Sequence, residues 1–225
     1  MKGTIYLLLL CSCFTAYGQY QYGLTPTTYE AYKKDIVENP ENQLVDLTEI
    51  IPGLELDIRY ATKNNFTGEV IYKLAKAYAR RPVAEALKNV QEDLQKQGLE
   101  LKIHDGYRPY AATVKFYEVY GDTTFVASPY KGSRHNRGCA IDLTLIDSKT
   151  KKELKMPTPY DSFKKEAFPD YPLKDKEAIK NRNLLIIAME KRGFRVYESE
   201  WWHFDFVGWE KFDVLDIEFE ELEKK

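Results

Sequence analysis

Two short segments of the chain combine histidine with acidic residues, although the sequence contains only three histidines. One segment contains His135 and Asp142, and the other contains Glu200 and His203. Imidazole nitrogen and carboxylate oxygen are ligands that zinc favours, and a catalytic zinc keeps three protein ligands and one open position. We therefore predict that His135, Asp142 and His203 hold one zinc ion per chain.

The surroundings of Asp142 strengthen this prediction. Asp142 lies between Ile141 and Leu143, and an acid within an apolar strand should be paired or ligated. Gly138 permits a sharp turn, so that His135 and Asp142 could meet. Each residue alone is also compatible with an ordinary buried, hydrogen-bonded side chain, and it is their combination that favours a metal site.

Two further residues suit the chemistry of hydrolysis. Glu200 could take a proton from water and deliver it to a leaving amine. In an ideal strand its odd spacing from His203 would put the two on opposite faces, so a bulge or bend at Trp201–Trp202 is required. Arg108 follows a predicted strand; it is either a surface charge or a group that stabilises an oxyanion.

The pattern of apolar residues predicts an α+β fold with a mostly antiparallel central sheet flanked by helices, and the zinc site in a cleft on the sheet. Strands are expected at 44–47, 54–60, 99–103, 140–145, 194–197 and 203–207, and helices at 82–97, 111–120 and 176–192. The inward face of the last helix should consist of Ile179, Leu184, Ile187 and Ala188. Residues 19–42 and 149–161 should be irregular, and the tail from 218 should fray or form a solvated helix end.

Composition narrows the class of protein. The length of 225 residues suits one domain, and the net charge of -2 with scattered Lys and Arg argues against a nucleic-acid partner. Past the N-terminal segment, no stretch is apolar enough to span a bilayer. His104 is interpreted as a hydrogen-bonded buried histidine.

The first residues have the features of an export signal: Lys2, an apolar stretch, and a small-x-small pattern that ends at Gly18. We therefore expect a signal peptide at 1–18, a catalytic domain at 19–225, and a periplasmic protein. Cleavage would leave Cys139 as the only cysteine, which excludes an internal disulfide. The alternative is a lipoprotein anchored through Cys13.

Several motifs together resemble one superfamily of zinc peptidases. The pattern consists of Ser133-x-His135-x-x-Gly138-x-Ala140-x-Asp142 followed by Glu200-x-Trp202-His203. It is similar to that of D-alanyl-D-alanine carboxypeptidases, VanX-type dipeptidases and the hedgehog signalling domain. Residues 57–62, 65–68 and 105–109 look like blocks of the dipeptidase branch. The resemblance implies that the two histidines and Asp142 bind zinc, that Glu200 is the base, and that Arg108 stabilises the transition state.

The same resemblance implies a substrate and the residues that hold it. Tyr60 and Asp161 would hold the substrate ammonium, Ser133 would contact the substrate or support the site, and Tyr72 would line the pocket. The implied activity is hydrolysis of free D-Ala-D-Ala to two D-alanines. The alternatives are a D,D- or L,D-carboxypeptidase or endopeptidase acting on longer peptidoglycan peptides, and a non-catalytic zinc-binding module. Cys139 departs from the family pattern, and its thiol could modulate metal binding or be oxidised.

Overall fold

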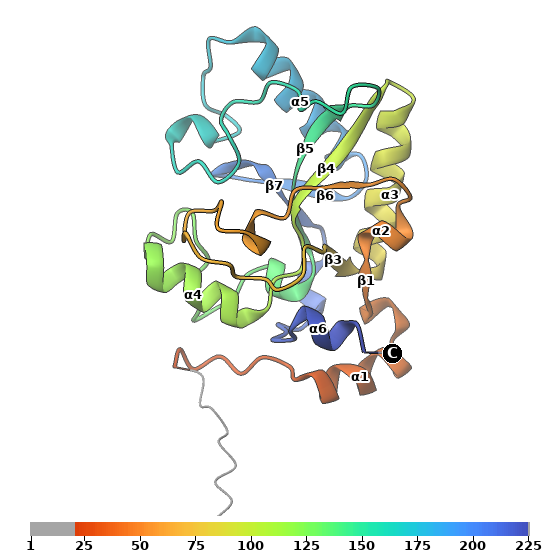
Figure 1. Ribbon diagram of the computed structural model, residues 1–225, viewed down its shortest axis with the longest axis vertical. Helices are drawn as coiled ribbons and strands as arrows, with labels where there is room; N and C mark the ends of the chain where they lie inside the picture. Colours follow the sequence, from red (N-terminus) through yellow and green to blue (C-terminus); the bar gives the residue numbers. More distant parts are fainter. Residues whose placement is uncertain (1–20, 225) are drawn as a thin grey trace, which may run out of the picture.

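A five-stranded sheet with the order β2-β4-β5-β7-β6 forms the centre of the computed structural model, which describes residues 21–224 (Figure 1). Its strands are β2 (Glu55–Leu56), β4 (Leu99–Asp105), β5 (Ala140–Asp147), β6 (Phe194–Tyr197) and β7 (Glu200–Phe206). Only β2 and β4 pair in parallel; the other neighbours are antiparallel. Two further strands, β1 (Leu44–Asp46) and β3 (Tyr78–Arg80), form a small antiparallel sheet. The predicted α+β class with a mostly antiparallel sheet is confirmed.

Helices lie on both sides of the central strands. They are α1 (Tyr29–Glu38), α2 (Leu47–Ile50), α3 (Arg81–Gln95), α4 (Tyr110–Tyr120), α5 (Lys176–Glu190) and α6 (Phe219–Leu222). Short 3-10 turns occupy Pro40–Asn42, Arg59–Ala61, His135–Arg137, Lys165–Ala167 and Trp209–Lys211. Helix α3 contacts β4, and α5 contacts β5, β6 and β7. Helix α4 lies across β4 and β5 from α3 (Figure 1).

Helix α3 follows from its sequence, whereas the buried face of α5 differs from the prediction. Pro82 stands in the first turn of α3, where its missing N–H costs nothing, and an apolar stripe including Leu87 is buried. In α5, Ile187 is 67% exposed, while Leu185 and Met189 are buried. Six consecutive apolar residues from position 184 make the helical phase ambiguous, which explains the error.

The N-terminal segment is helical where an irregular chain was expected. Thr28 caps α1 by accepting a hydrogen bond from the Ala31 amide. Tyr32 is buried, and its hydroxyl accepts a hydrogen bond from the Leu44 amide at the start of β1. Since one buried tyrosine anchors the helix, the sequence offers little apolar periodicity to reveal it.

Two other expectations needed correction. The strand expected at 54–60 pairs only at Glu55–Leu56, because the chain then enters the 3-10 turn that buries Tyr60. The tail is not merely solvated: Phe219 in α6 is buried against Tyr72 and the ring of Tyr78.

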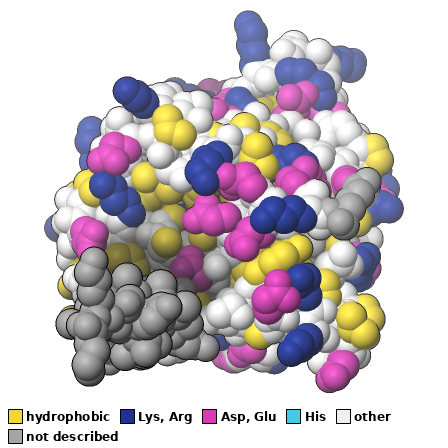
Figure 2. Space-filling view, turned by 60° about the horizontal axis from the view of Figure 1, so that its bottom comes forward, with side chains coloured by type: hydrophobic (Ala, Val, Ile, Leu, Met, Phe, Trp, Pro, Cys, Tyr) yellow, Lys and Arg dark blue, Asp and Glu magenta, His cyan; other side chains and the backbone are white. Residues whose placement is uncertain are grey.

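The surface drawn in Figure 2 mixes charges of both signs. Lysine, arginine and acidic side chains alternate across this face rather than gathering into a field of one sign. No helix among residues 21–224 has both the length and the apolar character needed to cross a membrane.

Gly138 is the backbone position on which the site depends most. It has φ +68 and joins the turn at His135 to β5, and an added Cβ would lie 2.6 Å from Leu44 Cδ2. Gly68 has nearly the same dihedral, φ +69, but open space around the added Cβ.

We predict that Gly138→Ala destabilises the fold more than Gly68→Ala does. Both substitutions incur roughly 1 kcal/mol of left-handed backbone strain, and Gly138→Ala adds about 1–3 kcal/mol of overpacking. Urea unfolding of the two variants measures the difference. Equal losses of unfolding free energy would show that the packing around Gly138 adapts.

Candidate active site

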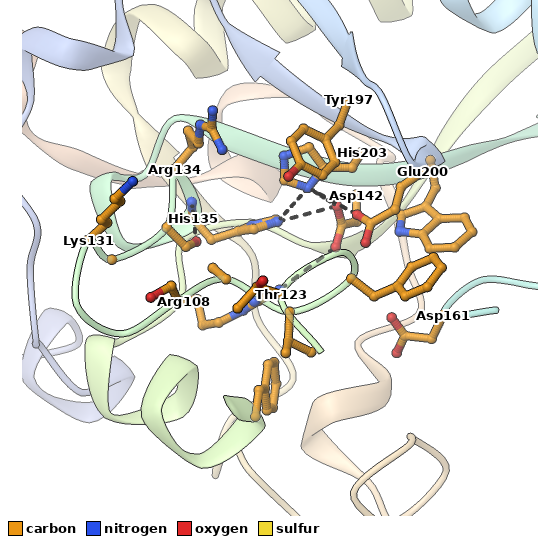
Figure 3. A pocket seen from close by; sticks show the side chains of 18 of the residues that line it. Arg108, Thr123, Lys131, Arg134, His135, Asp142, Asp161, Tyr197, Glu200 and His203 are labelled. Carbon is orange, nitrogen blue, oxygen red and sulfur yellow. Dashed lines mark hydrogen bonds and ion pairs between the residues drawn. The ribbon is translucent and has the colours of Figure 1, made fainter. Parts of the chain in front are cut away.

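The sequence-predicted residues His135, Asp142, Glu200 and His203 lie together on one side of the sheet and line a cleft of about 620 Å³ (Figure 3). His135 begins a 3-10 turn, Asp142 lies on β5, and His203 lies on β7 directly opposite Asp142. All four side chains are buried. Strand pairing therefore positions Asp142 and His203, and the turn that ends at Gly138 positions His135.

Three of these side chains, His135, Asp142 and His203, form a cluster that we call the His–Asp–His trio. His135 Nε2 lies 3.1 Å from His203 Nδ1, and Asp142 Oδ1 lies 3.3 Å and 3.1 Å from these two nitrogens. Ligands about 2.0–2.1 Å from a tetrahedral zinc would be roughly 3.3–3.4 Å apart. The trio therefore fits three ligands of one tetrahedral ion.

The outer ring nitrogens fix which inner nitrogens carry lone pairs. His135 Nδ1 lies 2.7 Å from the carbonyl oxygen of Gly106, and His203 Nε2 lies 2.9 Å from Asp205 Oδ1. When these outer nitrogens donate their hydrogens, His135 Nε2 and His203 Nδ1 both present lone pairs to Asp142. Such an arrangement of acceptors calls for a cation at its centre.

The carboxylate of Asp142 has two different oxygens. Oδ2 accepts a hydrogen bond of 3.1 Å from the hydroxyl of Tyr160, whereas buried Oδ1 has no hydrogen-bond partner among residues 21–224. Tyr160 is itself held by His104, whose ring stacks on it at 4.4 Å. His104 is thus a buried support for the site and does not line the cleft, as interpreted. Its Nδ1 lies 3.6 Å from Asp57 Oδ2 and has no hydrogen-bond partner among residues 21–224, so the expected hydrogen bond is not found at this atom.

Glu200 reaches the trio through an irregularity in β7. Val196 of β6 pairs with Phe204, but the next residue, Tyr197, pairs with Glu200, so the residues between them bulge. The predicted irregularity at this place is confirmed. Glu200 Oε2 lies 3.7 Å from His203 Nδ1. Burial raises the pKa of the Glu200 carboxyl to about 8, and a bound cation would lower it again.

Arg108 lines the cleft with its guanidinium held from behind. Its Nη2 donates to Asp105 Oδ2 at 2.7 Å and lies 3.9 Å from Asp142 Oδ2, while its Cζ stacks 4.7 Å above the ring of Phe116. Asp105 also accepts a hydrogen bond from the hydroxyl of Tyr72. The arginine is therefore a fixed positive charge beside the trio, which suits a group that stabilises an oxyanion.

Asp161 and Tyr60 meet at one end of the cleft. The Tyr60 hydroxyl donates to Asp161 Oδ2 at 2.9 Å, and both residues line the cavity. Asp161 has φ +58, which is uncommon for a residue other than glycine. Burial, together with the charge of Asp142, raises its pKa to about 7. Ser133 also lines the cleft, and its hydroxyl oxygen accepts a hydrogen bond from the His135 amide.

Two expectations about side chains near the site were wrong. Tyr72 is not among the residues that line the cleft; it lies behind Arg108 and supports Asp105. Cys139 is fully buried outside the cleft, and burial raises the pKa of its thiol to about 12. Since the thiolate is the reactive form, Cys139 is poorly suited to ligate a metal or to be oxidised.

Sequence reasoning missed the residues that orient the trio. They are Tyr160, Asp205 and the carbonyl of Gly106. Only Asp205 could have been predicted from the sequence, because it follows His203 by two residues and thus lies on the same face of the strand. The other contacts join segments that are distant in the sequence.

Comparison with known proteins identifies the family. The family model described as D-ala-D-ala dipeptidase matches residues 40–221. The chain belongs to this family. The resemblance drawn from the motifs is therefore confirmed, and the match extends beyond both ends of the motif blocks.

Relatives named D-alanyl-D-alanine dipeptidase match most of the chain, and a solved structure shows a weaker similarity. A D-alanyl-D-alanine dipeptidase of Escherichia coli (strain K12) is 35% identical over 177 residues, 79% of this chain and 91% of that protein. One of Enterococcus faecalis (strain ATCC 700802 / V583) is 29% identical over 187 residues, 74% of this chain and 93% of the relative. The solved structure of the LdcB LD-carboxypeptidase has 23% identity and a TM-score of 0.41, covering 73% of this chain and 68% of its own.

We predict that Tyr160→Phe weakens zinc binding about 10-fold or more, because it removes the hydrogen bond that orients Asp142. Competition with a chromophoric chelator measures the affinity. Tyr32→Phe is the matched control, since it removes another buried hydroxyl far from the cleft. Unchanged zinc affinity in Tyr160→Phe would mean that Asp142 is oriented without this bond.

Proposed function

We propose that the chain is a zinc metallopeptidase that hydrolyses free D-Ala-D-Ala to two D-alanines. The observation that carries the proposal is the His–Asp–His trio, with its acceptor atoms at tetrahedral spacing and Glu200 beside it. Membership of the D-ala-D-ala dipeptidase family supports the reaction, and relatives named D-alanyl-D-alanine dipeptidase support the substrate.

In this proposal His135, Asp142 and His203 hold the zinc ion. When bound there, zinc supplies Lewis-acid chemistry that acidifies water and polarises a carbonyl group. The donor set of two nitrogens and one oxygen matches that of a catalytic zinc site with an open position.

The remaining groups act on protons and charge. Glu200 takes a proton from the attacking water and delivers it to the amine of the departing D-alanine. Arg108, fixed by Asp105, stabilises the negative charge that develops on the carbonyl oxygen. Asp161, with Tyr60, accepts the substrate ammonium, and its charge is balanced when that cation arrives.

A direct assay tests the reaction. Purified protein, freed of metal by a chelator and then given zinc, should release D-alanine from D-Ala-D-Ala and leave the L,L dipeptide intact. Acetylation of the substrate amine should lower kcat/KM roughly 10–100-fold, because the ion pair with Asp161 is lost. Resistance of the dipeptide with cleavage of longer peptidoglycan peptides would identify a carboxypeptidase or endopeptidase instead.

The role of Glu200 has its own test. Glu200→Gln should keep zinc bound and lower kcat by about 100–10,000-fold, the usual contribution of a general acid and base. Glu198→Gln is the matched control, because this exposed acid lies nearby but outside the main cleft. Full activity of Glu200→Gln would overturn the assignment. Zinc binding without turnover of any peptide by the unaltered protein would indicate a non-catalytic module.

We also propose that the protein is exported to the periplasm with residues 1–18 removed. The support is the sequence pattern of Lys2, the apolar stretch and Gly18, all of which lie outside the described residues. The mass of the protein recovered from a periplasmic fraction should match that of a chain beginning at Gln19. A membrane-bound form with lipid on Cys13 would support the lipoprotein alternative, and an uncut cytoplasmic protein would contradict export.

A further inference from the structure

The cleft carries opposite charges at its two ends. Lys131 and Arg134 lie on one side of the His–Asp–His trio, and Asp161 lies on the other (Figure 3). A free dipeptide has an ammonium group at one end and a carboxylate at the other. Asp161 accounts for the ammonium in the proposed function, so the partner of the carboxylate is still to be assigned.

Aromatic rings hold Arg134 at the basic end. Its Cζ lies 5.5 Å from the ring centre of Tyr197 and 4.9 Å from that of Trp209, and all three residues line the cleft. Stacking against flat rings restricts the guanidinium group without using its N–H donors. The position of the charge is thus fixed before any substrate arrives.

The donors of Arg134 are largely free within residues 21–224. Its Nε lies 3.5 Å from Asp205 Oδ2 and makes no hydrogen bond, and no hydrogen bond from either Nη reaches a described residue. The neighbouring Arg137 differs, since its Nη1 donates to the carbonyl oxygen of Phe212. Lys131 is exposed at the rim and adds charge without a fixed orientation.

We propose that Arg134 binds the C-terminal carboxylate of the substrate, with Lys131 as a secondary charge. The two parallel N–H groups of a guanidinium match the two oxygens of a carboxylate. The inference rests on the proposed function of the same cleft and narrows its substrate class. The enzyme would require a free carboxylate on the residue that leaves as D-alanine.

The test compares two substrates that differ only at the carboxyl end, D-Ala-D-Ala and D-Ala-D-alaninamide. The unaltered enzyme should prefer the acid. In Arg134→Gln the KM for the acid should rise about 10–100-fold with kcat changed less than about threefold, and kcat/KM for the amide should change little. The preference for the acid should therefore fall at least about 10-fold. Arg134→Lys should restore part of it.

Two controls separate this role from a structural one. Arg195→Gln removes the same charge from an exposed residue of β6 that does not line the main cleft, and its preference should stay unchanged. Zinc affinity of Arg134→Gln, measured by chelator competition, should stay within about threefold. That measurement matters because Asp205 contacts both Arg134 and His203.

The outcomes are distinguishable from a failure of the proposed function. If the unaltered enzyme cleaves neither substrate, the proposed function fails. Suppose instead that the unaltered enzyme cleaves D-Ala-D-Ala. If Arg134→Gln then loses activity on the acid and on the amide equally, or loses zinc in parallel with activity, Arg134 does not bind the carboxylate.

Discussion

Three buried acceptor atoms that face one another set the strongest constraint in this molecule. Two imidazole lone pairs and a carboxylate oxygen converge within about 3.3 Å, an arrangement that is unfavourable in a protein interior unless a cation lies among them. The register of β5 against β7, with Asp142 opposite His203, creates this convergence. The bulge in β7 brings the carboxylate of Glu200 to the same side of the sheet as these three atoms.

The contacts behind the trio connect it to both ends of the cleft. Asp205 accepts from the ring of His203 and also lies beside Arg134, at the basic end. Tyr160 holds the trio's carboxylate and is followed in the chain by Asp161, at the acidic end. Groups that orient the trio are therefore neighbours of the groups proposed to bind the substrate termini, and a change in one set should affect the other.

The sequence was informative where chemistry is concentrated in short motifs. The spacing around Gly138 predicted the meeting of His135 and Asp142, and the odd step from Glu200 to His203 predicted the bulge. Regular alternation of apolar residues gave β4, and the single apolar stripe gave α3. These features are local in the sequence, so the types and spacing of the residues are enough to predict them.

Prediction failed where long-range packing decides the outcome. The single buried Tyr32 anchors α1, and a continuous apolar run hides the phase of α5. Tyr72 turned out to support Asp105 from behind because its position depends on how the loop after β2 folds back over β4. Likewise, nothing in the neighbourhood of Cys139 in the sequence tells that its thiol points into the core and away from the cleft.

The adjacency of Tyr160 and Asp161 has a consequence for variation in the loop that precedes them. One peptide unit, about 3.8 Å between Cα atoms, separates Tyr160, which holds the trio's carboxylate, from Asp161, which is proposed to bind the substrate ammonium. Insertions or deletions in the long loop before Tyr160 can alter how that loop crosses the surface. They leave Tyr160 and Asp161 adjacent, so the residue that orients Asp142 and the residue proposed to bind the ammonium would move together if this segment shifted.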